Sequence, residues 1–306
     1  MSVTRPTDGA YVCHGVTWAT GDPRLLLAPF PGGPLAYTEV LHHRLGYQVG
    51  SGRWCTGRYR FVDTVNVEAV ACPDRTGAEQ GGQCGPCASR DDFRFAHQFH
   101  QGAHAPNSLI MYMAQPHWLY LATFADGTTK VGTAAEPRRR SRLDEQGTLF
   151  ATYLVKSPDG RTVRHLEDAL TRRLGMTQTV RAAAKLRALA ELRDLQAVRA
   201  GHEADVASAI AALADLDVPA VPEEWTPPAE GDRLRTVDTE RVMYPHDPRD
   251  GEHGVTPVAC VGSQVLALLD DEAEAGYLLD LGTLKGRRIT LGPFASPGTT
   301  VQASLF

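Results

Sequence analysis

Residues 118–174 read WLYLATFADGTTKVGTAAEPRRRSRLDEQGTLFATYLVKSPDGRTVRHLEDALTRRL, and they predict the fold at the centre of the chain. Two short apolar runs flank Asp126-Gly127, which is a strong signal for a β-hairpin. The charged run EPRRRSRLDEQ predicts a helix with Pro137 near its start, and LFATYLV predicts a third strand. An amphipathic helix with Gly175 as its stop follows. The segment therefore predicts the element order ββαβα.

The chain on either side of this segment predicts more β structure and one helical region. Residues 10–70 are rich in β-branched and aromatic residues between Gly/Pro turns, which is typical of an antiparallel β region. Residues 178–215 are rich in Ala and Leu and predict two helices with a break near Gly201. A Pro-rich stretch at 218–232 predicts a linker. Strand patterns return beyond Arg233, including RLRTVDTERV, and predict a small β-barrel or sheet.

These patterns predict an α+β protein with four parts. A β-rich region with a cysteine loop at about 72–87 covers residues 1–106, and the ββαβα module covers residues 107–176. The helical segment and linker cover residues 177–232, and a C-terminal β subdomain covers residues 233–306.

Composition limits the classes of function. The 306 residues are 42% hydrophobic and 22% charged, which is ordinary for a globular protein with a substantial core. A net charge of -5 argues against coating nucleic acid through global charge, although a local basic patch stays open. The sequence contains neither a signal-peptide pattern nor 18 consecutive apolar residues, so we expect a cytoplasmic protein without a membrane partner. It does not predict an oligomeric state.

The cysteines predict a metal site. Cys84 and Cys87 form a C-x₂-C pair, Cys72 lies twelve positions upstream, and Cys55 beside Trp54 is the best fourth ligand. Six cysteines, four of them clustered, are too few for a secreted disulfide scaffold. Four thiolates around Zn²⁺ would instead form a closed structural site that orders this Gly-rich loop.

Other interpretations of these residues remain open. His97 or His100 can replace Cys55, and His97, His100 and His104 recur at a spacing that can also hold a catalytic metal. Cys-Gly-Pro-Cys is also a thioredoxin-like redox motif, and the thiols can simply be free. Cys13 and Cys260 lie in apolar runs and are expected to be small buried hydrophobes.

The module contains residues that resemble a known superfamily. Leu119-Tyr120, followed after the hairpin turn by Lys130-Val131-Gly132, resembles the paired signature tripeptides of the GIY-YIG nucleases. The arginines between Arg138 and Arg142 fall where that superfamily carries its catalytic arginine, and Glu167 matches its metal-binding glutamate. The resemblance implies a GIY-YIG-like module flanked by the two β regions, and metal-dependent hydrolysis of DNA or RNA phosphodiester bonds.

That chemistry needs an activated water, a neutralised phosphoryl group and a stabilised leaving oxygen. By resemblance, Tyr120 orients or activates water, Arg140 or Arg142 stabilises the phosphoryl charge, and Glu167 binds Mg²⁺ or Mn²⁺. Lys130 stands where the second tripeptide usually has a tyrosine, and it contacts phosphate or substitutes for that tyrosine. Further substrate contacts are expected from Gly132, Arg138, Arg139 and Gln146.

A second resemblance covers more of the chain. The string Arg142-Leu143-Asp144-Glu145-Gln146-Gly147 is similar to a motif of an uncharacterised bacterial and archaeal family known only as a domain of unknown function. Cys55-Thr56-Gly57, the cysteine loop, and GSQVLALLDD with LLDLGTLKGRRI near the C-terminus fit the same family. No activity transfers from it.

Two further functions compete with a nuclease. The lysine at position 130 favours a catalytically inactive nucleic-acid-binding or adaptor protein, and the scaffold can also serve another reaction on a small molecule or a charged RNA. Each candidate residue also has a structural alternative. Tyr120 can be a packing residue, the arginines a solvated face, and Glu167 a surface partner of Arg164.

Overall fold

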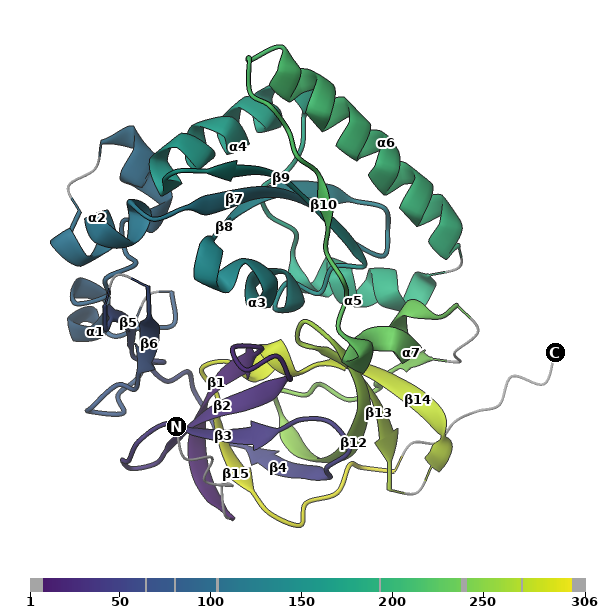
Figure 1. The fold of residues 1–306 in the computed structure, drawn as a ribbon. Coiled ribbons are helices and arrows are strands. Elements are labelled where there is room, and N and C mark those ends of the chain that lie inside the picture. Colours follow the sequence, from purple (N-terminus) through teal and green to yellow (C-terminus); the bar gives the residue numbers. More distant parts are fainter. Residues whose placement is uncertain are drawn as a thin grey trace.

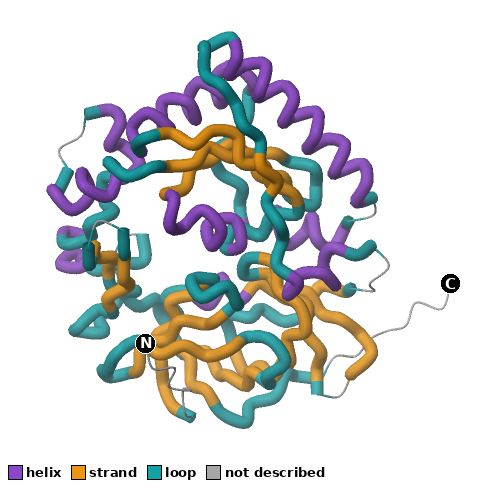
Figure 2. The backbone as a smooth tube through the Cα atoms, in the orientation of Figure 1, coloured by secondary structure: helices purple, strands orange, loops and turns teal. Residues whose placement is uncertain are grey.

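The protein is an α+β fold with three sheets in the described part of the chain. The computed structural model describes residues 8–63, 65–79, 81–102, 105–192, 194–237, 241–270 and 272–298. Figure 1 shows a large sheet beneath a smaller, helix-covered sheet, with the cysteine region beside them, and Figure 2 shows the same arrangement by secondary structure. No helix in these ranges is long and apolar enough to cross a membrane.

The large sheet combines both ends of the chain. Its nine strands run in the order β11-β14-β13-β12-β4-β15-β1-β2-β3. The N-terminal strands are β1 (Gly9–Thr17), β2 (Arg24–Pro29), β3 (Ala36–Glu39) and β4 (Leu45–Val49). The C-terminal strands are β11 (Val242–Met243), β12 (Gly251–Val261), β13 (Gln264–Leu269), β14 (Glu272–Asp280) and β15 (Arg288–Leu291). Because β15 pairs with both β1 and β4, the two β regions separated in the sequence share one sheet and one core.

The central segment has the element order predicted from its sequence. The strands β7 (His117–Thr123) and β8 (Thr129–Ala135) form a hairpin, and Gly127 adopts a positive φ in its turn. The short η2 (Glu136–Arg138) and α3 (Arg139–Asp144) precede β9 (Phe150–Ser157), and α4 (Gly160–Leu174) ends at the left-handed Gly175. The sheet order is β10-β9-β7-β8, where β10 (Glu223–Glu224) comes from the Pro-rich stretch.

Helices cover both faces of this smaller sheet. On one face, α4 and α6 (Leu195–Ala214) pack over Leu119 and Leu121, and α3 lies on the opposite face (Figure 1). The predicted helix break near Gly201 is wrong, because α5 (Ala182–Glu191) ends earlier and Asp194 caps α6 by accepting a hydrogen bond from the N–H of Ala197. Open space surrounds Gly201 inside α6, and a helix tolerates such a glycine at a modest cost.

The predicted strand from Arg233 is also partly wrong. The chain forms η3 (Ala229–Gly231) and the short α7 (Asp232–Arg235) there, with Leu234 fully buried. Leu234 packs in a cluster that includes Leu189 of α5 and Leu266 of β13, so a tertiary contact overrides the local strand pattern.

The cysteine region forms a small separate unit. The strands β5 (Arg58–Phe61) and β6 (Val67–Val70) pair as a two-stranded sheet, followed by the one-turn α1 (Gly85–Ser89). The elements η1 (Ala96–Gln101) and α2 (Asn107–Met113) then lead to β7. Phe61, Phe99 and Tyr112 belong to the apolar cluster that joins this unit to the module.

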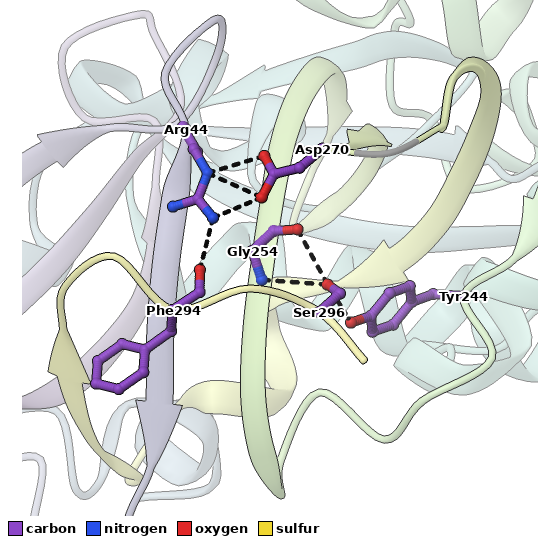
Figure 3. A network of polar contacts seen from close by, with 6 residues as sticks. All are labelled: Arg44, Tyr244, Gly254, Asp270, Phe294 and Ser296. Atoms are coloured by element: carbon purple, nitrogen blue, oxygen red, sulfur yellow. Dashed lines mark hydrogen bonds and ion pairs between the residues drawn. The ribbon is translucent and has the colours of Figure 1, made fainter. Parts of the chain in front are cut away.

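A pair of glycines lets the C-terminal segment cross the large sheet. Gly46 and Gly254 face each other on β4 and β12, and a Cβ at Gly254 would lie 2.6 Å from the carbonyl oxygen of Phe294. Figure 3 shows that Ser296 both accepts from the N–H of Gly254 and donates to its carbonyl oxygen, at 3.1 and 3.0 Å. Arg44 donates to the same segment at Phe294 and forms a bidentate ion pair with Asp270.

We expect Gly46→Ala to lower the free energy of unfolding by about 1–3 kcal/mol, because its new Cβ would clash with the carbonyl oxygen of Gly292. Gly201→Ala is the matched control and should raise that free energy by about 0.5–1 kcal/mol, since no atom lies within 4 Å of the new methyl group. Urea denaturation measures both. A Gly46→Ala variant as stable as the wild type would contradict the close contact between Gly46 and the C-terminal segment.

Candidate functional site

Tyr120 lies at the centre of the module and is fully buried. It faces Gly132 across the hairpin, and a Cβ at Gly132 would lie 2.6–2.9 Å from atoms of the tyrosine ring and hydroxyl. Gly132 is thus required by the ring of Tyr120, whereas the sequence analysis expected a substrate contact at this residue. Gln146 donates a hydrogen bond to the Tyr120 hydroxyl. Burial raises the pKa of Tyr120, opposed by the charge of Arg142 and by this hydrogen bond.

Arg142 lies next to Tyr120 but has a different environment. Its side chain lines a cleft and is exposed to solvent there, although protein surrounds it on most sides. The Tyr120 phenol and the carboxylates of Glu145 and Glu167 favour its charged form. Among the described residues, no carboxylate lies within ion-pair distance of Arg142. The protein therefore surrounds the guanidinium on its buried side, and a ligand in the cleft can reach its other side.

Lys130 and Glu167 lie behind this arginine, away from solvent. Lys130 is 7% exposed and Glu167 is 4% exposed. Burial lowers the pKa of Lys130 to about 8; the charges of Arg142 and Arg164 lower it too, whereas Glu167 opposes the shift. Glu167 accepts a hydrogen bond from Arg164 at 2.7 Å. The carboxylate thus already has a cationic partner, and two further cations act in its neighbourhood.

Glu167 does not fit the Mg²⁺ or Mn²⁺ that the resemblance implies. A divalent cation at this carboxylate would meet the positive charges of Arg164, Arg142 and Lys130 in a poorly solvated region, where repulsion is strong. In the described part of the chain, the sole group of three or more His, Cys, Asp or Glu side chains close enough to share a metal is the cysteine cluster. The surroundings of Glu167 therefore suit an ion pair with Arg164 better than a divalent metal ion.

The cleft that Arg142 lines lies between three parts of the protein. Its volume is about 1440 Å³. One wall is the module, with Thr133, Arg138, Arg142 and Arg164; the second is the large sheet, with His14 and Lys285; the third is the cysteine unit, with Tyr59 and Arg75. Figure 1 shows α3, β1 and the β5–β6 pair around this region. Five Lys or Arg side chains and two Glu side chains line it, so the cleft is cationic in a protein of net charge -5.

The remaining predicted arginines have structural partners. Arg138 lines the cleft and donates to both carboxylate oxygens of Glu145, at 2.9 and 3.0 Å. Arg139 lies over the rings of Trp118 and Tyr153 and pairs with Glu223 at 3.0 Å, so it attaches β10 to the module. The side chain of Arg140 is 64% exposed and lies 3.8 Å from Asp144. Arg139 and Arg140 do not line the cleft.

The string from Arg142 to Gly147 positions the arginine. Asp144 is buried and accepts a hydrogen bond from Trp225 Nε1 at 3.0 Å, which anchors the Pro-rich stretch. The carbonyl oxygen of Gln146 accepts a hydrogen bond from the half-buried Lys185 at 2.6 Å. Gly147 has φ +72°, and a Cβ on Gly262 would lie 2.8 Å from its backbone nitrogen, so the loop contacts the large sheet directly. Each part of the string therefore has a packing or hydrogen-bonding role.

The four predicted zinc ligands converge. Cys55, Cys72, Cys84 and Cys87 are buried, and their sulfurs all lie within 4.8 Å of one another. Zn–S bonds of about 2.3 Å in a tetrahedron place sulfurs about 3.8 Å apart, and Cys72 and Cys84 are 3.9 Å apart. Burial raises the pKa of Cys55 to about 11, and the N–H groups of Gly57 and Cys84, which donate to its sulfur, oppose that shift. The cluster can hold a structural metal such as zinc.

The alternatives for these residues have different outcomes. Cys55 occupies the fourth position, whereas His100 hydrogen-bonds to Asp168 at 3.0 Å. The predicted histidine metal site is not tested, because His104 and the side chain of His97 lie outside the described residues. Cys13 and Cys260 are buried in the core of the large sheet, as expected.

Arg75 connects the cysteine cluster to the large sheet, and the sequence analysis missed it. It is buried and donates to the carbonyl oxygens of Pro29, Gly33 and Cys72. Lys185 and Lys285 were also missed. No local pattern identifies such residues, because a single Lys or Arg in a turn or on a helix is ordinary in sequence.

Comparison with known proteins identifies one family. A family model described as "Protein of unknown function (DUF2797)" matches residues 70–232. This match includes the module, the cysteine loop at about 72–87 and the helical segment, whereas Cys55 lies outside it. No curated protein and no solved structure matches the chain.

We expect freshly purified protein to contain about one zinc per chain, and Cys72→Ser to lose it and to unfold at a lower temperature, because structural zinc binding contributes to folding free energy. Elemental analysis and thermal denaturation measure these effects. Cys260→Ala is the control that should retain zinc, since Cys260 lies in another core. Equal zinc in the wild type and Cys72→Ser would contradict the site.

The stability contributed by Asp144 should depend on pH. Burial raises its pKa from 3.8 to about 6, although the Trp225 hydrogen bond opposes the shift. A raised carboxyl pKa means that folding favours the protonated form, so stability is greatest below about pH 4 and falls as pH rises to about 6. Relative to Asp144→Asn, the wild type should lose on the order of 1–3 kcal/mol over this interval. Urea denaturation of both proteins at several pH values would show a constant difference if this were wrong.

Proposed function

The chain belongs to the DUF2797 family, whose model matches more than half of it, and we propose that its cationic cleft binds the phosphodiester backbone of a nucleic acid. This family membership confirms the prediction of an uncharacterised family. The observation that carries the proposal is Arg142, which is exposed in the cleft and oriented by buried Tyr120. An arginine held in this way can grip a phosphate through two parallel hydrogen bonds.

The charges of the cleft support an anionic ligand. Arg138 and Arg164 are neutralised by Glu145 and Glu167, and Glu68 on the third wall pairs with Arg60. Arg75 is buried and donates to backbone carbonyl oxygens. That leaves Arg142 and Lys285, both exposed and both without an ion pair to any described carboxylate. Two available cations on facing parts of the protein suit a ligand with at least two negative charges.

The size of the cleft favours a polymer over a small molecule. Typical small-molecule pockets measure roughly 300–1,000 Å³, and this cleft measures about 1440 Å³. We infer that one segment of a DNA or RNA chain occupies it. This is the binding or adaptor function that the lysine at position 130 favoured in the sequence.

Cleavage of the bound backbone is a second candidate. The convergence of Tyr120, Arg142 and Glu167, on elements in the order ββαβα, supports a GIY-YIG-like scaffold. Two observations favour binding over hydrolysis: the Tyr120 hydroxyl is buried and hydrogen-bonded to Gln146, and Glu167 is paired with Arg164. A hydrolase would need both groups to change partners.

We expect the wild type to bind nucleic acid with an affinity that falls as salt rises, and Arg142→Ala to lower that affinity about tenfold and the salt slope by about one. Fluorescence anisotropy with labelled DNA and RNA measures both. Arg172→Ala is the matched control, because Arg172 is an exposed arginine of α4 that does not line the cleft. Equal losses in the two variants would contradict a role for Arg142 beyond general charge.

A gel assay separates binding from cleavage. Binding without hydrolysis predicts intact strands in the presence of EDTA, Mg²⁺ or Mn²⁺. If strands are cut only with Mg²⁺ or Mn²⁺, and Glu167→Gln abolishes the cutting, the nuclease interpretation holds and our reading of Glu167 is wrong.

A further inference from the structure

The third wall of the cleft carries aromatic side chains. Tyr59 and Phe93 line it, together with Tyr112 from α2, whereas Tyr37 lines the cleft from β3 of the large sheet. Tyr59 packs edge-on against Phe93 with ring centroids 6.0 Å apart, and Phe93 packs against Tyr112 at 5.4 Å. Tyr59 is nonetheless 42% exposed. Its neighbours therefore fix the ring while part of its surface stays open.

The cations of the cleft lie on the other two walls. Arg142 belongs to the module and Lys285 follows η4 (Leu281–Leu284) beside the large sheet. The stem of Lys285 packs on Gly15, where a Cβ would lie 3.6 Å from its Cδ atom. The cleft thus presents available charges and an open aromatic ring to the same space.

We propose that the cleft takes a single-stranded segment of nucleic acid, whose phosphates contact Arg142 and Lys285 and whose bases stack on Tyr59. The inference rests on the proposed function and specifies its substrate. A base has a π-face that can stack on an aromatic ring only when it is unpaired and unstacked from its neighbours. A duplex offers a backbone to the cations but hides its base faces, so it leaves the aromatic wall unused.

The charges and rings together separate this ligand from an acidic protein. An acidic peptide would use Arg142 and Lys285 but carries no planar groups that need an exposed ring beside them. A nucleic-acid strand carries both a phosphate and a base in every repeating unit, and alternating cationic and aromatic contacts are typical of proteins that bind single strands.

Fluorescence anisotropy with full-length protein tests the proposal on three labelled probes of equal length: oligo-dT, oligo-U and a blunt-ended DNA duplex. We expect at least one single strand to bind about tenfold more tightly than the duplex. Tyr59→Ala should lower the single-strand affinity about tenfold, whereas Tyr59→Phe should retain it, since a phenyl ring also stacks. Duplex affinity should change little in both variants.

Matched variants keep the test independent of folding. Tyr59→Leu preserves an apolar side chain on β5 and should lose single-strand affinity with unchanged zinc content and thermal stability. Lys285→Ala should weaken binding to every probe and reduce the salt slope by about one. Arg172→Ala should leave both the affinity and the salt slope unchanged.

The outcomes distinguish this inference from the function on which it rests. Salt-sensitive binding with equal affinity for single strands and duplex, or with no effect of Tyr59→Ala and Tyr59→Leu, would overturn the inference and leave the proposed function standing. Competition by polyglutamate as effective as that by oligo-dT would overturn it in favour of an acidic peptide. Absence of binding to all three probes would overturn both.

Discussion

The contact between Tyr120 and Gly132 is the constraint on which the candidate site depends. The ring of Tyr120 occupies the space that a side chain at position 132 would need. The tyrosine therefore covers Gly132, which is its partner on the other strand of the hairpin. This arrangement buries the phenol completely, and its hydroxyl accepts a hydrogen bond from the side-chain amide of Gln146. The loop from Arg142 to Gly147 is thereby held against the sheet, and Arg142 is directed into the cleft.

Electrostatics explains why this site differs from an open metal centre. Glu167 carries a buried negative charge near Arg142. Arg164 donates a hydrogen bond to this carboxylate, and Lys130 interacts with it electrostatically. A buried carboxylate among three cations is stabilised by them and offers little to a divalent ion. The same balance leaves Arg142 charged and exposed to the cleft. The site therefore suits the recognition of an external anion.

The cysteine cluster shapes the cleft from the other side. Its four sulfurs gather residues separated by up to 32 positions, and Arg75 then binds backbone carbonyls of both the cluster and the large sheet. A loop rich in glycine has high conformational entropy when unfolded, so a shared metal is a physically reasonable way to order it. Tyr59 is hydrogen-bonded to Asp91 and Asp92, which come directly after this loop. A metal that orders the loop would therefore also help to position the aromatic wall of the cleft.

The sequence by itself determined the elements of the central module and the four cysteines that cluster. Hairpin chemistry at Asp126-Gly127, helical spacing ending at Gly175, and four clustered thiols act over short distances and leave direct patterns. Only the tertiary structure decided that the strands at both ends share one sheet, that Lys185, Arg75 and Lys285 approach the module or its cleft, and that Glu167 is already paired. These features depend on contacts between distant residues, and their free energies come from burial and charge that no local pattern records.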